Sequence, residues 1–153
     1  MDIVDVSLRL GVATLAGAAL GLNRDLHAKP TGIRTLGLVG LGSAVAVMTA
    51  VGTGDSGAVS RVIQGIVTGI GFLGAGVIVR THEGRQVHGL TTAACAWLTA
   101  CIGAACGAGD WPIVLVSIPL IFILLIFGGS IEKALRPLWG DPPGGPGDRP
   151  PAD

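Results

Sequence analysis

Long uncharged segments alternate along this chain with short segments that carry most of the charges. Residues 62–79, between Arg61 and Arg80, carry no formal charge, and a helix of that length reaches about 27 Å, close to the thickness of a bilayer core. Similar runs cover residues 35–54, 89–109 and 111–131, and a less clean run covers residues 3–22. Asp5 and Arg9 interrupt the last of these, four residues apart and so able to pair along one helical face. The pattern predicts an all-α integral membrane protein with about five transmembrane helices.

Composition favours the same class. Hydrophobic residues make up 50% of the 153 residues and charged residues 13%, whereas a soluble domain carries about a quarter charged residues. The formal net charge is zero, so no basic surface is expected to recruit nucleic acid. The first residues are acidic where a cleavable signal peptide is basic, so we expect the first helix to be retained.

The basic residues predict the orientation, because short cytoplasmic loops collect Lys and Arg. Most of them fall in the first loop, the third loop and the tail: Arg24, Lys29, Arg34, Arg80, Arg85, Lys133, Arg136 and Arg149. Asp55 and Arg61 in the second loop and Asp110 in the fourth belong to the opposite side. We therefore expect the N-terminus outside and the C-terminus in the cytoplasm. Residues 1–136 form the expected membrane domain, and residues 137–153, rich in Pro and Gly, an expected disordered cytoplasmic tail.

The glycines of residues 62–79 include the spacing G-x-G-x-x-G at Gly69, Gly71 and Gly74. In a dinucleotide-binding protein this spacing follows a buried strand and opens an amphipathic helix. Here it lies inside an uncharged run, so we interpret the glycines as surfaces that let neighbouring helices approach closely. This predicts a central third helix. The packing glycines expected on it are Gly65, Gly69, Gly71, Gly74 and Gly76.

Polar side chains inside the apolar runs form interhelical hydrogen bonds or line a polar pathway, and the sequence leaves both open. The candidates are Gln64, Thr68, Thr91 and Thr92. The three cysteines, Cys95, Cys101 and Cys106, have no metal-ligand spacing, and we interpret them as small packing residues. We expect neither a metal site nor a cofactor.

Four blocks resemble the membrane domain of the MgtC/SapB family. They are GLNRD at 21–25, KPTGIRT at 29–35, RVIQGIVTGIGFLGAGVI at 61–78 and VHGLTTAA at 87–94. The resemblance covers about residues 5–130. It implies a multi-pass protein of the bacterial inner membrane with a role in adaptation to low magnesium and, in some pathogens, in virulence through survival inside macrophages. Some family members are thought to act by contacting a membrane ATPase.

The chain departs from the family pattern at two points. Many relatives carry a cytoplasmic C-terminal domain of the ACT type, where this sequence has only the Pro/Gly-rich tail. His88 stands where the family more often has Arg. With an ordinary pKa of about 6.5, a histidine loses most of its charge near neutral pH, so His88 is either a pH-sensitive anchor or a neutral interface residue.

Within the matched blocks, polar and basic residues are expected to surround the cytoplasmic ends of the first four helices. This cytoplasmic rim consists of Asn23, Arg24, Lys29, Arg34, Thr35, Arg80, Arg85 and His88. The rim either reflects topology alone or binds anionic headgroups, a phosphate-bearing ligand or an acidic patch on a partner. Arg34 is the first choice, because it precedes an uncharged run and is followed by Thr35, which is able to cap a helix.

The sequence contains no phosphate-loop motif, no nucleophile elbow and no His/Glu pair at metal-binding spacing, so we expect no enzyme. A magnesium transporter would need hard oxygen ligands, usually carboxylates, and the four clean apolar runs contain no Asp or Glu. The favoured function is therefore a regulatory role through contacts with a membrane partner, such as an ATPase. The alternative is a channel or carrier subunit for magnesium or another small solute. A homo-oligomer is a further candidate assembly.

Overall fold

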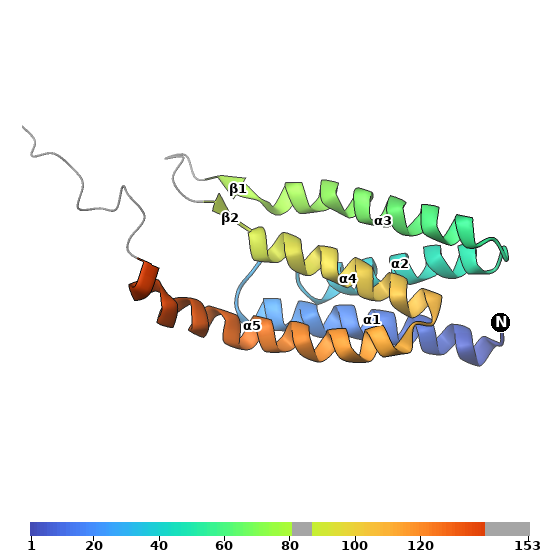
Figure 1. The fold of residues 1–153 in the computed structure, drawn as a ribbon, viewed down its shortest axis with the longest axis horizontal. Coiled ribbons are helices and arrows are strands. Elements are labelled where there is room, and N and C mark those ends of the chain that lie inside the picture. Colours follow the sequence, from blue (N-terminus) through green and yellow to red (C-terminus); the bar gives the residue numbers. More distant parts are fainter. Residues whose placement is uncertain (81–86, 140–153) are drawn as a thin grey trace, which may run out of the picture. The chain divides into compact units, whose positions relative to one another are not determined.

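The computed structural model describes residues 1–80 and 87–139, and this part of the chain contains five helices (Figure 1). Each helix is long and apolar enough to cross a membrane. The prediction of about five spanning helices is thereby confirmed. The helices are α1 (Ile3–Leu26), α2 (Ile33–Val51), α3 (Ser56–Val77), α4 (Leu90–Ala108) and α5 (Trp111–Trp139).

The helix ends differ from the ends of the apolar runs. α3 begins at Ser56 because the Asp55 carboxylate accepts a hydrogen bond of 2.8 Å from the Gly57 amide and caps the helix. Arg61, expected in a loop, lies inside α3, and its Nη2 is 2.9 Å from Asp55 Oδ2. α5 continues to Trp139, beyond the domain boundary expected after residue 136. At the start of α3, capping and ion pairing thus extend the helix into charged sequence.

A two-stranded β-hairpin joins α3 to α4 where the sequence predicted only a loop. Its strands are β1 (Val79–Arg80) and β2 (Val87–His88), which run antiparallel. Val79 lies opposite His88 and Arg80 opposite Val87. Strands of two residues are too short to produce an alternating pattern, so only the β-branched valines mark them in the sequence.

The chain divides into two compact units, Met1–Ile118 and Pro119–Asp153, and the boundary falls within α5. In the first unit α4 packs against α1, α2 and α3, and α2 packs against α1 and α3 as well as α4. Ile70 and Gly74 are the buried residues of α3. The expectation of a central third helix is therefore wrong, since α2 and α4 form the centre of this unit.

The backbones of α2 and α4 touch at glycines. A Cβ atom on Gly103 would overlap the carbonyl oxygen of Gly40, and one on Gly107 would lie 2.6 Å from the carbonyl oxygen of Ala44. Only glycine fits at these two positions of α4. The small-residue contact that holds neighbouring helices together in lipid is thus made by α2 and α4 in this chain.

The predicted packing glycines of α3 are mostly uncovered within one chain. Gly74 is the exception, since a Cβ there would meet the Cβ of Ala93 at 3.5 Å. For Gly65, Gly69, Gly71 and Gly76, no atom of the described residues lies within 4 Å of an added Cβ. The described residues therefore show no neighbouring helix packed closely against these four glycines.

Candidate functional site

A buried arginine joins α1 to the start of α4. Arg24 lies in the last turn of α1 and is 7% exposed. Its Nη2 donates a hydrogen bond to the hydroxyl of Thr92, which is buried in the first turn of α4. The sequence placed Arg24 on the rim and Thr92 among the intramembrane polar residues, and the structure brings them together. We call Arg24, Thr92 and the backbone amides of residues 90–92 the Arg24 site.

The chain turns sharply after Arg24. The Arg24 carbonyl accepts hydrogen bonds from the amides of His27, at 3.1 Å, and Lys29, at 3.0 Å, and so closes α1. In the loop that follows, Ala28 and Thr31 have positive φ values of 50° and 70°, which are uncommon for residues with a Cβ and marked for a β-branched one. Thr31 Oγ1 is buried, and no hydrogen-bond partner for it occurs among the described residues.

Asp25, next to Arg24 in sequence, is engaged elsewhere. Its Oδ2 accepts a hydrogen bond of 3.0 Å from the amide of Ile33, the first residue of α2. A side chain at Gly32 would overlap this carboxylate. Asp25 therefore satisfies one of the free amides at the start of α2.

The expected cap of α2 by Thr35 is wrong. The helix begins at Ile33, so Thr35 lies inside its first turn and the capping contact comes from Asp25 across the loop. Arg34 also lies inside that turn and is exposed. The helix begins two residues before the uncharged run, so the start of the run does not mark the start of the helix.

The start of α4 is shaped by Gly89. This residue has φ +94°, and a Cβ on it would overlap the carbonyl oxygen of Val77, so only glycine fits. The first backbone hydrogen bond of the helix runs from the Ala93 amide to the Gly89 carbonyl, at 2.9 Å. The amides of residues 90–92 precede that bond, and no side chain in the described part of the chain caps the helix. The positive end of the helix dipole lies at this turn.

The Arg24 site is consequently electropositive. In the part of the chain that the structure describes, ion pairs join Asp5 to Arg9 at 2.8 Å and Asp55 to Arg61 at 2.9 Å, and none includes Arg24. Arg24 Nε is buried without a hydrogen-bond partner among the same residues. A buried charge is unfavourable unless it is paired, and the dipole of α4 adds to the positive potential. This arrangement is suited to hold a negatively charged group.

The remaining rim residues do not join this buried contact. Lys29 and Arg34 are exposed, and Asn23 is half-buried, with its carbonyl accepting a hydrogen bond of 2.7 Å from His27 Nδ1. Arg80 and His88 occupy the strands of the hairpin, and Arg85 lies outside the described residues. The structure thus shows that Arg24 is buried whereas Lys29 and Arg34 are exposed, which the sequence alone did not predict.

The intramembrane candidates also separate. Thr92 is buried, whereas Gln64 and Thr68 on α3 and Thr91 on α4 are exposed. The sequence did not single out Gly89, Asp25 or Thr31, although all three lie in or next to the blocks GLNRD, KPTGIRT and VHGLTTAA. Gly89 and Asp25 each precede the start of a helix, and residues of these types before a helix are a sequence signal that could have identified them.

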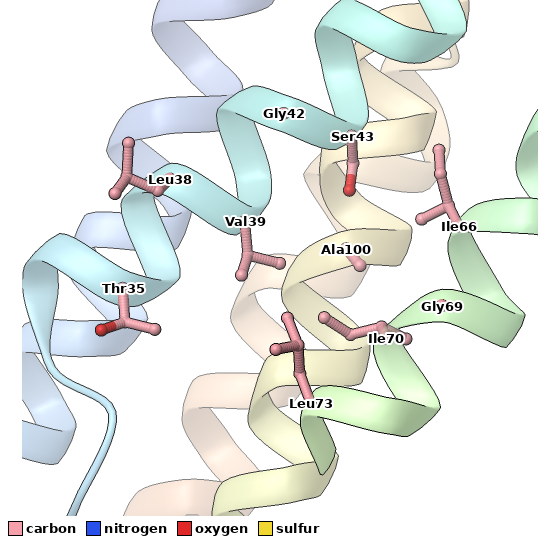
Figure 2. A pocket seen from close by; sticks show the side chains of 10 residues that line it. All are labelled: Thr35, Leu38, Val39, Gly42, Ser43, Ile66, Gly69, Ile70, Leu73 and Ala100. Carbon is pink, nitrogen blue, oxygen red and sulfur yellow. The ribbon is translucent and has the colours of Figure 1, made fainter. Parts of the chain in front are cut away.

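An apolar groove of about 530 Å³ lies between α2, α3 and α4. Figure 2 shows Val39, Ile70 and Leu73 converging across it. Ser43 contributes a buried side chain. Thr35 and Gly69, two of the ten residues that line the groove, were candidates from the sequence. The complete lining is Thr35, Leu38, Val39, Gly42, Ser43, Ile66, Gly69, Ile70, Leu73 and Ala100.

A second arginine joins α1 to the other end of α4. Arg9 Nε lies 2.8 Å from Asp5 Oδ1, which confirms the pairing expected from their spacing. Arg9 Nη1 also donates a hydrogen bond of 3.0 Å to the carbonyl of Gly107, in the last turn of α4. A cation at this position satisfies a free carbonyl and complements the negative end of the helix dipole.

Comparison with known proteins gives matches that cover most of the chain. The model of the MgtC family matches residues 10–134. Protein SrpB of Synechococcus elongatus is 44% identical over 150 residues, which cover 90% of this chain and 81% of SrpB. Protein MgtC of Salmonella typhimurium is 44% identical over 104 residues, 68% of this chain and 44% of that protein. Protein MgtC of Brucella abortus is 40% identical over 130 residues, 84% of this chain and 50% of that protein. The chain thus spans about half the length of these two MgtC proteins. No solved structure matches it.

Proposed function

Since the chain belongs to the MgtC family and is a multi-pass membrane protein, we propose that it is a regulatory protein of the bacterial inner membrane. It acts in adaptation to low magnesium and in ion homeostasis by contacting a membrane partner, such as an ATPase. The proposed role is non-catalytic and needs no cofactor. A contribution to virulence would follow from the same contact in a pathogen.

The exposed face of α3 supports this proposal. It carries Gln64 and Thr68, both exposed, beside the glycines at 65, 69, 71 and 76, above which a Cβ meets no described atom within 4 Å. Lipid chains offer no hydrogen bond to an amide or a hydroxyl, whereas a neighbouring helix offers both hydrogen bonds and close backbone contact. A partner helix is therefore a better neighbour for this face than lipid.

A channel or carrier subunit is the second candidate, and the groove between α2, α3 and α4 favours it. Thr35 and Ser43 give the groove two hydroxyl groups. A magnesium path would need a cluster of oxygen ligands with carboxylates. Within residues 1–80 and 87–139, no group of three His, Cys, Asp or Glu side chains is placed to hold a metal ion. The regulatory role is thus the better supported of the two.

The test uses a strain that lacks the chromosomal copy and grows in limiting magnesium. Gly65→Leu and Gln64→Leu change the exposed face of α3 and should abolish support of growth, because they remove the close approach and the hydrogen-bonding group. Expression and thermal stability in detergent should stay at the wild-type level, since nothing described lies within 4 Å of a Cβ at Gly65. Val116→Leu, at another exposed position, is the matched control and should support growth.

Wild-type growth of both α3 variants would contradict a role for this face. The carrier alternative is measured separately, as magnesium uptake into proteoliposomes that contain only the purified chain. Saturable uptake would replace the regulatory proposal with the carrier one.

A further inference from the structure

Arg24 is a buried cation that makes no ion pair with a described residue. The side chain is more than nine-tenths buried, and the adjacent carboxylate of Asp25 is bound to the amide of Ile33. The hydroxyl of Thr92, which accepts the hydrogen bond from Nη2, is neutral. A guanidinium group in such a place is stable when an anion completes its surroundings.

Several hydrogen-bond donors at the Arg24 site have no described acceptor. Nε retains an N–H without a described partner. Thr92 uses its oxygen to accept from Arg24, so its hydroxyl hydrogen is available to donate. The amides of residues 90–92 have no partner within α4 and no side-chain cap among residues 1–80 and 87–139. The dipole of α4 makes this end positive, so the helix reinforces the charge of Arg24 instead of offsetting it.

The Arg24 site can also be reached from the surface of the protein. Leu90 and Thr91 are exposed, in the same turn of α4 as the buried Thr92. The site lies at the ends of α1 and α4, and helix ends in a multi-pass protein lie near the lipid headgroups. The dominant anion there is the phosphate group, whose several oxygens are able to accept from a guanidinium fork, a hydroxyl and helix amides together.

We propose that the Arg24 site binds a phosphate group, carried either by an anionic lipid headgroup or by free inorganic phosphate. Arg24 supplies the charge and the Nε donor, and Thr92 orients the guanidinium while donating its own hydrogen. The uncapped amides of α4 complete the site. This assignment differs from the rim interpretation, which chose Arg34, because Arg34 is exposed and Arg24 is buried.

The experiment uses the purified full chain and has one arm for each source. In the lipid arm, native mass spectrometry measures binding of phosphatidylglycerol and of phosphatidylcholine. In the free-ion arm, the midpoint of thermal unfolding is compared in inorganic phosphate and in chloride at equal ionic strength. We expect a preference for phosphatidylglycerol if the source is lipid, or a midpoint raised by phosphate alone if the source is the free ion.

Variants link the effect to the site. Arg24→Gln should weaken the observed binding by at least about tenfold, the loss expected for one charge-assisted contact. Arg34→Gln, the exposed control in the first turn of α2, should change binding less than about twofold. If Arg24→Gln does not fold, two other variants serve instead. Arg24→Lys keeps the positive charge and removes the guanidinium fork, and Thr92→Val keeps the side-chain shape and removes the hydroxyl group.

Three results would overturn the proposal. The first is a wild-type chain that shows neither a preference for phosphatidylglycerol nor stabilisation by phosphate. The second is an equal loss of binding in Arg24→Gln and Arg34→Gln, which would indicate diffuse electrostatic attraction. The third concerns Glu83, a carboxylate in the sequence between Arg80 and Val87. If phosphate does not stabilise the wild-type chain and Glu83→Gln lowers its stability as much as Arg24→Gln does, the partner of Arg24 is a carboxylate of this chain.

Discussion

Single polar side chains hold the ends of these helices, and they act across loops as well as along a helix. Asp25 stands at the end of α1 and binds the first amide of α2, while Arg9 reaches from α1 to the last turn of α4. Both contacts satisfy backbone groups that a helix leaves free at its ends. The loop after Arg24 is thus anchored at both sides although it contains two residues with positive φ.

We predict that Asp25→Ala lowers the free energy of unfolding by about 1 kcal/mol, the usual cost of a lost helix cap. Asp25→Asn should cost much less, because the amide oxygen still accepts from Ile33. Asp2→Ala is the matched control, since Asp2 precedes α1 without a capping hydrogen bond from its side chain. Unfolding in detergent, followed by circular dichroism, measures all three. Equal stability of Asp25→Ala and Asp2→Ala would show that the contact contributes nothing.

At the scale of elements, the glycines of this chain fall into two groups that look alike in the sequence. Gly40 of α2 and Gly103 and Gly107 of α4 lie where two backbones touch. Most of the glycines of α3 face no described atom of another element within 4 Å. The order of helices along the chain does not reveal which helix is enclosed. The effect of a substitution on stability should therefore distinguish the two groups of glycines, which the sequence alone does not.

Gly103→Ala should destabilise the protein by about 1 to 3 kcal/mol, because the added methyl group overlaps the carbonyl of Gly40 and forces α2 and α4 apart. Gly65→Ala should be neutral or stabilise by up to about 1 kcal/mol, since the methyl group meets open space and alanine favours the helix. The measurement is unfolding in detergent, with both variants at equal concentration. If Gly65→Ala lowered the free energy of unfolding more than Gly103→Ala does, α3 rather than α4 would be the enclosed helix.

The helices and the Asp5–Arg9 pair could be predicted because both depend on residues close in sequence. The long apolar runs determine the spans, and a spacing of four residues determines the pair. The contact between Arg24 and Thr92 joins residues 68 positions apart, and each residue was a candidate without the other. Neither periodicity nor spacing carries information about such a distant neighbour, which depends on how α1 and α4 pack. The β-hairpin and the cap from Asp25 were missed for the related reason that each requires two segments at once.

For the molecule as a whole, the distribution of basic residues predicts the orientation in the membrane. Reporter fusions after Leu26, Glu83 and Leu138 should report the cytoplasm, because the basic loops and tail are held there. Fusions after Asp55 and Asp110 should report the outer side. Leu26 is the last residue of α1, Leu138 precedes the last residue of α5, and Asp55 and Asp110 lie between helices. A cytoplasmic signal at Asp55 would contradict the five-span topology.

The bond between Arg9 and the carbonyl of Gly107 has a consequence for the order of events during synthesis. The two residues are 98 positions apart, so at a usual rate of elongation Gly107 is made roughly 5 to 20 s after Arg9. Throughout that interval Asp5, four residues away, is already present as a partner for the charge. The salt bridge with Asp5 therefore pairs the charge of Arg9 before α4 has been synthesised. Once α4 is in place, the carbonyl of Gly107 accepts a second hydrogen bond from the same guanidinium group.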